Sequence, residues 1–304
     1  MTNLTLKQFR YFEALVRHGH FGRAAGGCAI SQPALSLQIK QLEEQLGAVL
    51  FERGPRQVRL TSFGQEFALR VRAILGAVDE LEDLARASKD HLAGLIRIGV
   101  IPTIAPYLLP RIISGLTERY DGLDIHVRET LTVKLIQELA DGRLDAAIVA
   151  LPVSEPAFVE VDLFAEDFVL VRPGEDEGKP VPSVEMLREM RLLLLEEGHC
   201  FRDQALAFCK MNSAMPREML EGSSLSTLVQ MVNAGIGVTL IPEMAVAVET
   251  RSAAVSVARF SSPEPSRTIG MIWRKTSPLS KQLLQISDVV RQAAENLRKE
   301  CPTA

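Results

Sequence analysis

The chain has 304 residues, of which 47% are hydrophobic and 24% charged, with a formal net charge of −4. This composition is that of a soluble protein long enough for two or three domains, and it excludes a membrane span, because no apolar run approaches the ~20 residues that a span needs. Residues 1–65 carry eight Lys/Arg against four Asp/Glu, whereas the remainder carries 26 against 34. Only the first segment therefore has a charge suited to DNA.

Helical spacing of apolar residues predicts a first helix that ends near Gly19 and a short second helix over residues 21–27. A third helix, over residues 31–47, has serine as its N-cap and proline in its first turn. This order predicts a helix-turn-helix whose last helix enters the major groove through its first turns. The residues that we expect to contact bases or phosphates on this helix are Ser31, Gln32, Pro33, Ser36, Gln38 and Lys40.

The next segment predicts a hairpin, with strands at residues 50–53 and 57–60. Its arginines, Arg53, Arg56 and Arg59, suit the phosphate backbone, whose contacts position a protein without reading the base sequence. Residues 1–61 are therefore predicted to form a winged helix-turn-helix. The alternative is a generic three-helix module with solvated charges.

A long helix is predicted from residues 61–62 onward, and we assign residues 62–90 to it. Its apolar residues advance by alternating steps of four and three, as in a coiled coil: Phe67, Val71, Ile74, Val78, Leu81 and Ala85. We expect this stripe to be a dimerisation arm, because two tethered DNA contacts reinforce each other. The alternative is that the helix packs against its own domain.

Residues 91–304 alternate between strand and helix patterns, with strands at 95–101, 123–129 and 144–150 and helices at 107–120 and 133–140. Further elements are expected at 168–172, 186–190, 192–195, 225–234, 237–241 and 268–274, before a final helix at 278–298. The repeated units predict an α/β fold with mainly parallel sheets and two subdomains that enclose a cleft. Subdomain I is assigned to about 91–161 and 269–304, and subdomain II to about 162–268.

Two of the four cysteines, Cys200 and Cys209, lie nine positions apart. If the residues between them are helical, their Cα atoms are roughly 14 Å apart. A disulfide needs them within about 7 Å, so joining these thiols would require local unwinding. Residues 1–8 lack the basic-then-apolar pattern of a signal peptide, so the chain is expected in the cytoplasm, where a disulfide is more often catalytic or sensory than structural. Cys28 and Cys301 have no evident partner in the sequence.

The surroundings of Cys200 suggest a reactive thiol. The buried strand at 192–195 and the turn at Gly198-His199 place Cys200 at a helix N-terminus, where partial positive charge, with His199 and Arg202 adjacent, favours the thiolate that attacks peroxides. A sulfenic acid formed there would condense with a second thiol, and Cys209 is the obvious candidate. The alternative is that both are small core hydrophobes, which suits Cys209 better than Cys200.

The motif Ser31-Gln32-Pro33-Ala34-Leu35-Ser36, followed by residues 39–43, resembles the LysR-type bacterial transcription regulators. Residues 99–103, 106–110, 198–209 and 267–270 are similar to the peroxide-sensing OxyR branch of that family. The resemblance covers the whole chain. It implies a winged helix-turn-helix, a linker helix and a periplasmic-binding-protein-like regulatory domain of two α/β subdomains.

By position, the resemblance makes Cys200 the peroxide-reactive cysteine and Cys209 the resolving one, joined in a redox-active disulfide. The polar residues implied around a bound peroxide are Thr103, Thr132, His199, Asp203 and Arg267. A peroxide needs donors and acceptors for both oxygens, and its leaving hydroxide needs a proton or positive charge. Thr103 and Thr132 each follow a predicted strand, so both could face one pocket, although ordinary helix capping is the alternative for them.

The resemblance therefore implies a hydrogen peroxide sensor that controls antioxidant genes and is not an enzyme. Its implied partners are promoter DNA, RNA polymerase, a thiol reductant and further copies of itself, as a homodimer or homotetramer, with no cofactor, metal or membrane. One rival is a LysR-type regulator that answers to a small organic effector. A thiol peroxidase is a second, and it would not need residues 1–90. A zinc site from His199, Cys200 and Cys209 lacks a fourth ligand at the usual spacing.

Overall fold

The structure is a computed structural model that describes residues 4–53, 58–87, 92–209, 220–261 and 264–300. The chain forms two compact units, Met1–Ala85 and Arg86–Ala304, so the long helix belongs with the N-terminal unit as far as Ala85. Among the described residues, no helix is long and apolar enough to cross a membrane.

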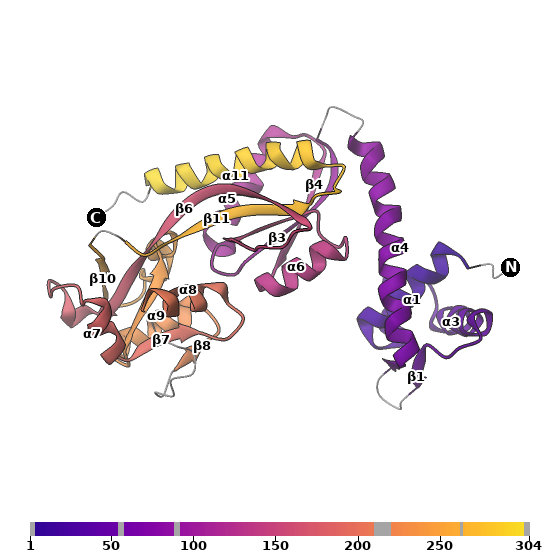
Figure 1. The fold of residues 1–304 in the computed structure, drawn as a ribbon, viewed down its shortest axis with the longest axis horizontal. Helices are drawn as coiled ribbons and strands as arrows, with labels where there is room; N and C mark the ends of the chain where they lie inside the picture. The colour runs from indigo at the N-terminus through magenta and orange to yellow at the C-terminus, as the bar shows by residue number, and fades with distance from the viewer. Residues whose placement is uncertain (1–3, 54–57, 88–91, 210–219, 262–263, 301–304) are drawn as a thin grey trace. The chain divides into compact units, whose positions relative to one another are not determined.

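The N-terminal unit is the predicted winged helix-turn-helix (Figure 1). Its elements are α1 (Leu6–His18), α2 (Phe21–Gly27), α3 (Gln32–Leu46), β1 (Phe51–Arg53), β2 (Val58–Leu60) and α4 (Ser62–Ala87). Gly19 and Gly47 end α1 and α3 in the left-handed conformation, at φ 59° and 66°, which glycine adopts without the steric cost of a Cβ. Phe12, Leu35 and Val71 are fully buried in the core of this unit.

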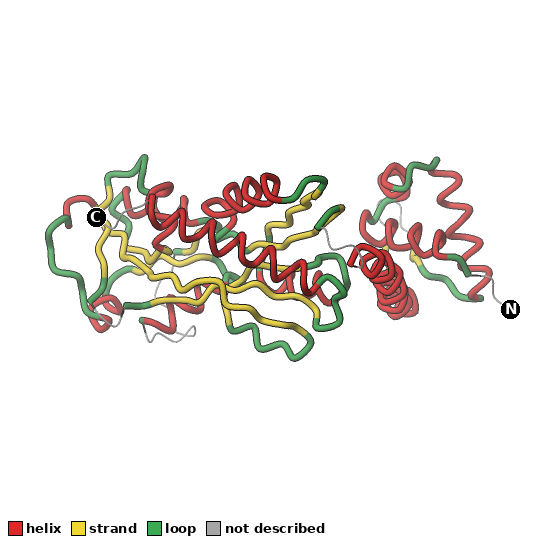
Figure 2. Tube along the Cα trace, turned by 90° about the horizontal axis from the view of Figure 1, so that it is seen from above, coloured by secondary structure: helices red, strands yellow, loops and turns green. Residues whose placement is uncertain are grey.

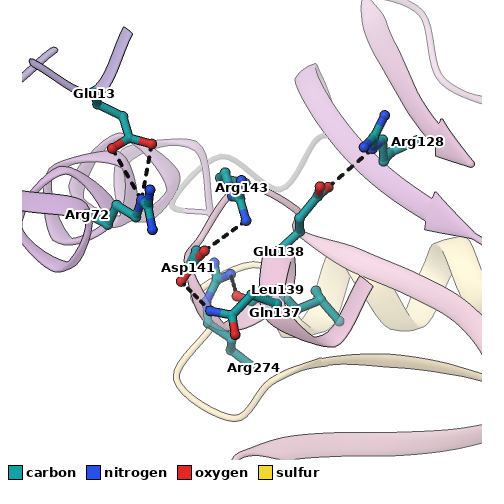
Figure 3. Close-up of polar contacts among 9 residues, drawn as sticks. All are labelled: Glu13, Arg72, Arg128, Gln137, Glu138, Leu139, Asp141, Arg143 and Arg274. Atoms are coloured by element: carbon teal, nitrogen blue, oxygen red, sulfur yellow. Dashed lines mark hydrogen bonds and ion pairs between the residues drawn. The ribbon is translucent and has the colours of Figure 1, made fainter. Parts of the chain in front are cut away.

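The stripe on α4 divides into two parts. Phe67 and Val71 pack into the core of their own unit, as the alternative interpretation of this helix expected. An ion pair between Arg72 Nε and Glu13 Oε1, 3.1 Å apart, also joins α4 to α1 (Figure 3). Farther along the helix, Ile74 and Leu81 are 42% and 66% exposed. Of the predicted stripe, it is this second part that offers an apolar surface to a partner.

The C-terminal unit contains one nine-stranded sheet in the order β4-β3-β5-β11-β6-β9-β7-β8, with β10 paired to β6. Its strands are β3 (Gly94–Val100), β4 (Leu123–Glu129), β5 (Ala146–Leu151), β6 (Phe158–Pro173), β7 (Leu192–Leu195), β8 (Glu221–Gly222), β9 (Val238–Pro242), β10 (Val255–Arg259) and β11 (Ser266–Arg274). The helices are α5 (Ala105–Arg119), α6 (Thr132–Ala140), α7 (Val184–Glu189), α8 (Cys200–Phe208), α9 (Leu225–Asn233), α10 (Val246–Glu249) and α11 (Ser280–Glu300), with 3₁₀ turns η1 (Gly174–Asp176) and η2 (Glu243–Ala245).

The expectation of mainly parallel strands was correct at the two ends of the sheet and wrong in its middle. β3 pairs in parallel with β4 and β5, and β7 pairs in parallel with β8 and β9. In contrast, β6 and β11 are antiparallel to each other and to their other neighbours. The prediction placed only residues 168–172 in a strand here, whereas β6 begins ten residues earlier, at Phe158.

β6 and β11 run side by side from one subdomain to the other, with α11 beside them (Figures 1 and 2). Two separate hydrophobic cores lie at the two ends of β6, and β11 contributes to the first of them. One contains Ile98, Ile148 and Trp273, and the other contains Leu170, Leu193 and Leu240. Because β6 contributes Phe158 to the first core and Leu170 to the second, residues near its midpoint lie between the subdomains.

The end of α6 is tied to the sheet by a group of polar contacts (Figure 3). Arg274 Nη1 on β11 donates to the carbonyl oxygens of Leu139 and Leu144, at 2.6 and 2.9 Å. Glu138 pairs with Arg128 on β4 at 3.5 Å. These contacts fix α6, and with it the position of Thr132 at the start of this helix.

Candidate functional site

Cys200 lines a narrow pocket between the subdomains, which leaves about 0 Å³ for the centre of a water-sized molecule. The lining residues come from three chain segments that follow β3, β4 and β7: Ile101, Pro102, Thr103, Leu131, Thr132, Gly198, His199 and Cys200. Because β3 and β4 are parallel, their carboxyl ends lie at one edge of the sheet, and the residues after them meet there. The pocket therefore brings together two threonines that the sequence separates.

Arg267 holds one wall of this pocket through Thr103. Its Nη1 donates to Thr103 Oγ1 at 2.9 Å, and its Nη2 donates to the Thr103 carbonyl oxygen at 3.2 Å. On its other side, Nε and Nη2 donate to Glu166 Oε2 at 2.9 and 2.8 Å, and the guanidinium lies 5.2 Å from the centre of the Phe201 ring. Since the Thr103 oxygen accepts from Arg267, its own hydroxyl proton is left to donate to another group.

The hydroxyl of Thr132 differs from that of Thr103 in its hydrogen bonding. Its Oγ1 is buried and makes no hydrogen bond with any described residue. Thr132 is also the first residue of α6 rather than its N-cap, so helix capping, the alternative considered for it, does not apply. A buried hydroxyl without a partner costs about 1–3 kcal/mol, which a polar ligand in the pocket would recover.

Cys200 is the first residue of α8, as the sequence predicted, and it is half-buried. The turn before it depends on Gly198, which has φ +96°. A Cβ on Gly198 would lie 3.0 Å from Leu131 Cδ1 in the opposite pocket wall. Glycine thus permits both the positive φ and the close approach of the two walls around the Cys200 thiol.

Cys209 lies directly after the last residue of the same helix and is completely buried in the core of subdomain II. Both cysteines are free thiols, and the helix between them keeps them apart. Burial raises the pKa of the Cys209 thiol to about 11, although the Arg188 cation opposes this shift. Arg188 Nε also donates to the Cys209 carbonyl oxygen at 2.8 Å. Cys209 is therefore protonated at neutral pH and shielded from solutes while α8 stays folded.

Neither side chain expected to add positive charge beside Cys200 does so. Burial lowers the pKa of His199, although Glu196 opposes the shift, so its imidazole is neutral at pH 7. Arg202 is 5% exposed and turns away to Glu221 and to the Leu195 carbonyl oxygen, at 2.7 and 2.8 Å. The sequence shows that these residues are adjacent, but it does not show where their side chains point.

Of the five residues expected around the peroxide, the structure brings together four. Thr103, Thr132 and His199 line the pocket, and Arg267 reaches it through Thr103. Asp203 does not line it: this residue is exposed on the first turn of α8. At a helix N-terminus, its carboxylate complements the helix dipole and stabilises α8.

Sequence reasoning missed two buried carboxylates. Glu166, directly opposite Arg267 in the β6–β11 register, was not predicted to lie in a strand. Glu249 Oε1 accepts a hydrogen bond from the Tyr107 hydroxyl at 2.6 Å, and its other oxygen accepts from Ser226. Tyr107 belongs to α5 of subdomain I, but its side chain packs in the core of subdomain II. Its hydrogen bond to Glu249 therefore joins the subdomains. No local pattern marks either glutamate, because Tyr107 and Arg267 lie more than 100 residues from Glu249 and Glu166, respectively.

The candidate DNA-contacting residues form a second, separate group on the N-terminal unit. Ser31 caps α3 by accepting from Ala34 N at 3.3 Å. Gln32, Pro33, Lys40 and, on β2, Arg59 are exposed, as is Ser31, whereas Ser36 and Gln38 are partly buried. The Arg53 side chain and all of Arg56 lie outside the described residues, as does Cys301.

Comparison with known proteins matches both units to one family. Residues 6–65 match the bacterial regulatory helix-turn-helix proteins of the lysR family, and residues 89–295 match the LysR substrate binding domain. The chain is 42% identical over 300 residues to a probable hydrogen peroxide-inducible genes activator of Streptomyces viridosporus, covering 96% of this chain and 95% of that one. It is 39% identical over 292 residues to the DNA-binding transcriptional dual regulator OxyR of Escherichia coli K12, covering 95% of each.

Solved structures agree with this assignment. A full-length cysteine-to-aspartate variant of OxyR from Pseudomonas aeruginosa matches with a TM-score of 0.76 and 36% identity, over 95% of both chains. An H2O2-bound cysteine-to-serine mutant of Corynebacterium glutamicum OxyR matches with a TM-score of 0.67 and 34% identity, over 96% of this chain and 93% of that one. The chain therefore belongs to the LysR family of bacterial transcription regulators and, within it, to the OxyR branch of hydrogen peroxide-inducible gene activators.

Proposed function

We propose that this protein binds promoter DNA through its winged helix-turn-helix and changes transcription when hydrogen peroxide oxidises Cys200. One observation carries the proposal. Cys200 is the first residue of α8 and lines a pocket together with Thr103 and Thr132, while the second thiol, Cys209, is buried at the other end of the same helix. The family resemblance and the H2O2-bound relative support the same assignment.

The first step is attack of the Cys200 thiolate on one peroxide oxygen. The S–O bond forms as the O–O bond breaks, and Cys200 becomes a sulfenic acid while hydroxide leaves and takes a proton to become water. The hydroxyls of Thr103 and Thr132 hold the two peroxide oxygens, and Arg267 fixes the Thr103 hydroxyl. Positioning of this kind lowers the barrier because the reacting atoms are already aligned.

The second step joins the two cysteines. Nine helical positions separate their Cα atoms by about 14 Å, so α8 must unwind before Cys209 can reach Cys200. The Cys209 thiol then displaces the sulfenic oxygen as water, and a disulfide forms. Reduction by a thiol reductant of the cell breaks this bond and restores both thiols.

Unwinding of α8 transmits the signal, because a covalent bond then selects between two packings of this part of subdomain II. Rearranged subdomains change the spacing of the DNA contacts in a homodimer or homotetramer, and with it the recruitment of RNA polymerase. The exposed apolar residues on the second part of α4 suit the dimer contact. We place this activity in the cytoplasm and assign no catalytic turnover or cofactor to it.

The small volume of the pocket favours peroxide over an organic effector at this position. The pocket is nearly closed and leaves about 0 Å³ for the centre of a water-sized molecule, whereas most sites for organic ligands have roughly 300–1,000 Å³, so an organic effector would need it to open much farther than a peroxide would. Among the described residues, no group of three His, Cys, Asp or Glu side chains is placed to hold a metal ion, which disfavours the zinc alternative.

The test is mass spectrometry of the full chain after peroxide treatment, together with DNA binding at each redox state. A peptide that joins Cys200 to Cys209 is expected. Cys200→Ser should still bind DNA and lose its response, Cys209→Ser should accumulate sulfenic acid without a disulfide, and Cys28→Ser serves as the matched control with a full response. A full response in Cys200→Ser would reject the proposal.

A further inference from the structure

A second, larger cavity lies where β6 passes from one subdomain to the other. It has a volume of about 360 Å³, within the usual range for small organic ligands. Its walls come from β6, η2 and the end of α11: Phe164, Ala165, Glu166, Asp167, Glu243, Met244, Ala294, Leu297 and Arg298. It shares none of its lining residues with the pocket of Cys200.

The cavity combines an apolar part with charges of both signs. Phe164, Met244 and Leu297 supply the apolar surface. The guanidinium of Arg298, an exposed residue, lies 5.6 Å from the centre of the Phe164 ring, which places one cation at the α11 side. A ligand anion can pair with Arg298 there, since a guanidinium over a ring face keeps its donors for a carboxylate.

Negative charge gathers on the η2 side. Glu243 pairs with Arg259, and this hydrogen bond, followed by the nearby charges of Glu264 and Asp167, raises the pKa of Arg259. Three carboxylates thus act on one guanidinium, and two of them, Glu243 and Asp167, also line the cavity. This acidic surplus suits a ligand ammonium group.

We propose that this cavity is a binding site for a zwitterionic amino acid with an apolar side chain. Its ammonium group is held on the Asp167 and Glu243 side, its carboxylate pairs with Arg298, and its side chain packs on Phe164 and Leu297. A purely anionic ligand would meet the acidic surplus, and a purely cationic one would leave Arg298 with only the charge of Glu166, which Arg267 already binds. The zwitterion alone satisfies both sides of the cavity.

The cavity is connected to the Cys200 pocket by a short chain of contacts. Glu166 Oε1 accepts from the backbone N–H of Met244 at 3.2 Å, while its Oε2 accepts from Arg267, which in turn donates to Thr103. Met244 also packs against both hydrophobic cores. Because Met244 and Glu166 also line the cavity, a ligand there favours the subdomain arrangement in which Arg267 holds Thr103 and α8 is folded.

This coupling rests on the proposed function. It predicts that the bound amino acid slows closure of the Cys200–Cys209 disulfide, because closure requires α8 to unwind. Coupling between sites in proteins is typically about 5- to 150-fold. We expect a slowing of about fivefold or more when the cavity is saturated.

The binding test is calorimetry of the reduced, full-length protein with L-phenylalanine and L-leucine. 2-Phenylethylamine and 3-phenylpropanoate are the matched probes that lack the carboxylate and the ammonium group. One amino acid should bind per chain, and each truncated probe should bind about tenfold or more weakly, since each lacks one charge-assisted contact. Absence of binding by both amino acids, or equal binding of either truncated probe, would overturn the assignment.

Charge variants locate the site. Asp167→Asn and Arg298→Gln should each weaken L-phenylalanine binding about tenfold or more. The controls are Asp162→Asn on the same strand and Lys299→Gln on the same helix. Each removes a charge of the same sign from an exposed residue outside the lining, and should leave binding unchanged. Binding that survives both cavity substitutions, or falls equally in the controls, would place the ligand elsewhere.

The coupling is then measured as the rate of disulfide closure with and without saturating L-phenylalanine. Slowing in the wild-type chain, absent in Arg298→Gln, supports the connection, and an unchanged rate with proven binding rejects it. Failure of the proposed function has a different signature: Cys200 is not oxidised by peroxide at all, whereas the calorimetry, which needs no cysteine chemistry, is unaffected.

Discussion

Arg188 donates from Nε to the carbonyl oxygen of Cys209 at 2.8 Å, so α7 holds the C-terminal end of α8 in place. At the other end of this helix, Arg202 binds the Leu195 carbonyl oxygen and Glu221. The two cysteines therefore lie at the ends of a helix that arginines hold at both ends. Its unwinding must break such contacts before the thiols can meet.

Replacement of Arg188 should speed the second oxidation step without affecting the first. A hydrogen bond from a charged donor contributes about 1.5–3 kcal/mol, less where water competes for it. We expect Arg188→Gln to lower the free energy of unfolding by about 1–2 kcal/mol and to accelerate disulfide closure up to about tenfold. Stopped-flow oxidation, with the sulfenic acid and the disulfide measured separately, resolves the two steps.

Arg251→Gln, which removes an exposed arginine of subdomain II, is the control and should change neither rate. If Arg188→Gln destabilises the protein yet leaves the closure rate as it was, the contact is purely structural.

The buried Cys209 thiol should make stability depend on pH in the alkaline range. Its pKa is raised from an ordinary 9.0 to about 11 in the folded chain, so the thiol is neutral in both states below pH 9 and its contribution is fully present there. Above pH 9 the unfolded chain ionises first, and the contribution is lost as the pH rises through 11. Two pKa units correspond to about 2.7 kcal/mol.

Urea unfolding of reduced wild-type protein and of Cys209→Ala between pH 8 and 11 checks this. The difference in unfolding free energy between the two should shrink by about 2–3 kcal/mol over that range, because ionisation of every other group is common to both. A difference that stays constant with pH would show that the thiol is not buried as described.

Thr132→Val should separate function from stability. Because Thr132 Oγ1 makes no hydrogen bond with the described residues, its loss should change the free energy of unfolding by no more than about 0.5 kcal/mol, or stabilise the fold. Peroxide oxidation of Cys200 should nevertheless slow about tenfold or more, since one of the two positioned hydroxyls is gone.

Thr103→Val is the comparison, because its oxygen accepts from Arg267 and its loss leaves a buried guanidinium donor without that partner. It should slow oxidation and also cost about 1–3 kcal/mol of stability. Unaltered oxidation in Thr132→Val would remove that hydroxyl from the peroxide site.

The N-terminal unit should show two kinds of DNA contact. Arg59→Gln should weaken binding to all sequences alike and reduce the slope of log affinity against log salt by about one, as expected for loss of one phosphate contact. Gln32→Ala, at the start of α3, should instead cost about 1–3 kcal/mol on the preferred operator and little on other DNA. Binding titrations on both DNAs at several salt concentrations distinguish the two, and an unchanged salt slope in Arg59→Gln would exclude its phosphate contact.

The helix-turn-helix could be predicted almost residue by residue because its signals are local. Ser31 as N-cap and glycines at positions 19 and 47 mark helix ends within a few residues of the atoms that they satisfy. The same is true of Cys200, whose place at the start of α8 follows from the strand and turn that precede it. Spacing alone also shows that a folded helix must keep Cys200 and Cys209 apart.

The chemistry around those thiols was decided by the tertiary structure. Arg267 meets Glu166, 101 residues away, only because β6 and β11 pair in antiparallel fashion, and no local pattern predicted that pairing. The same folding turns Arg202 toward Glu221, buries Cys209 and leaves Asp203 exposed outside the pocket. Local patterns determine where a helix begins and which residues it carries. The direction and charge of each side chain depend on partners that only the packed strands bring near.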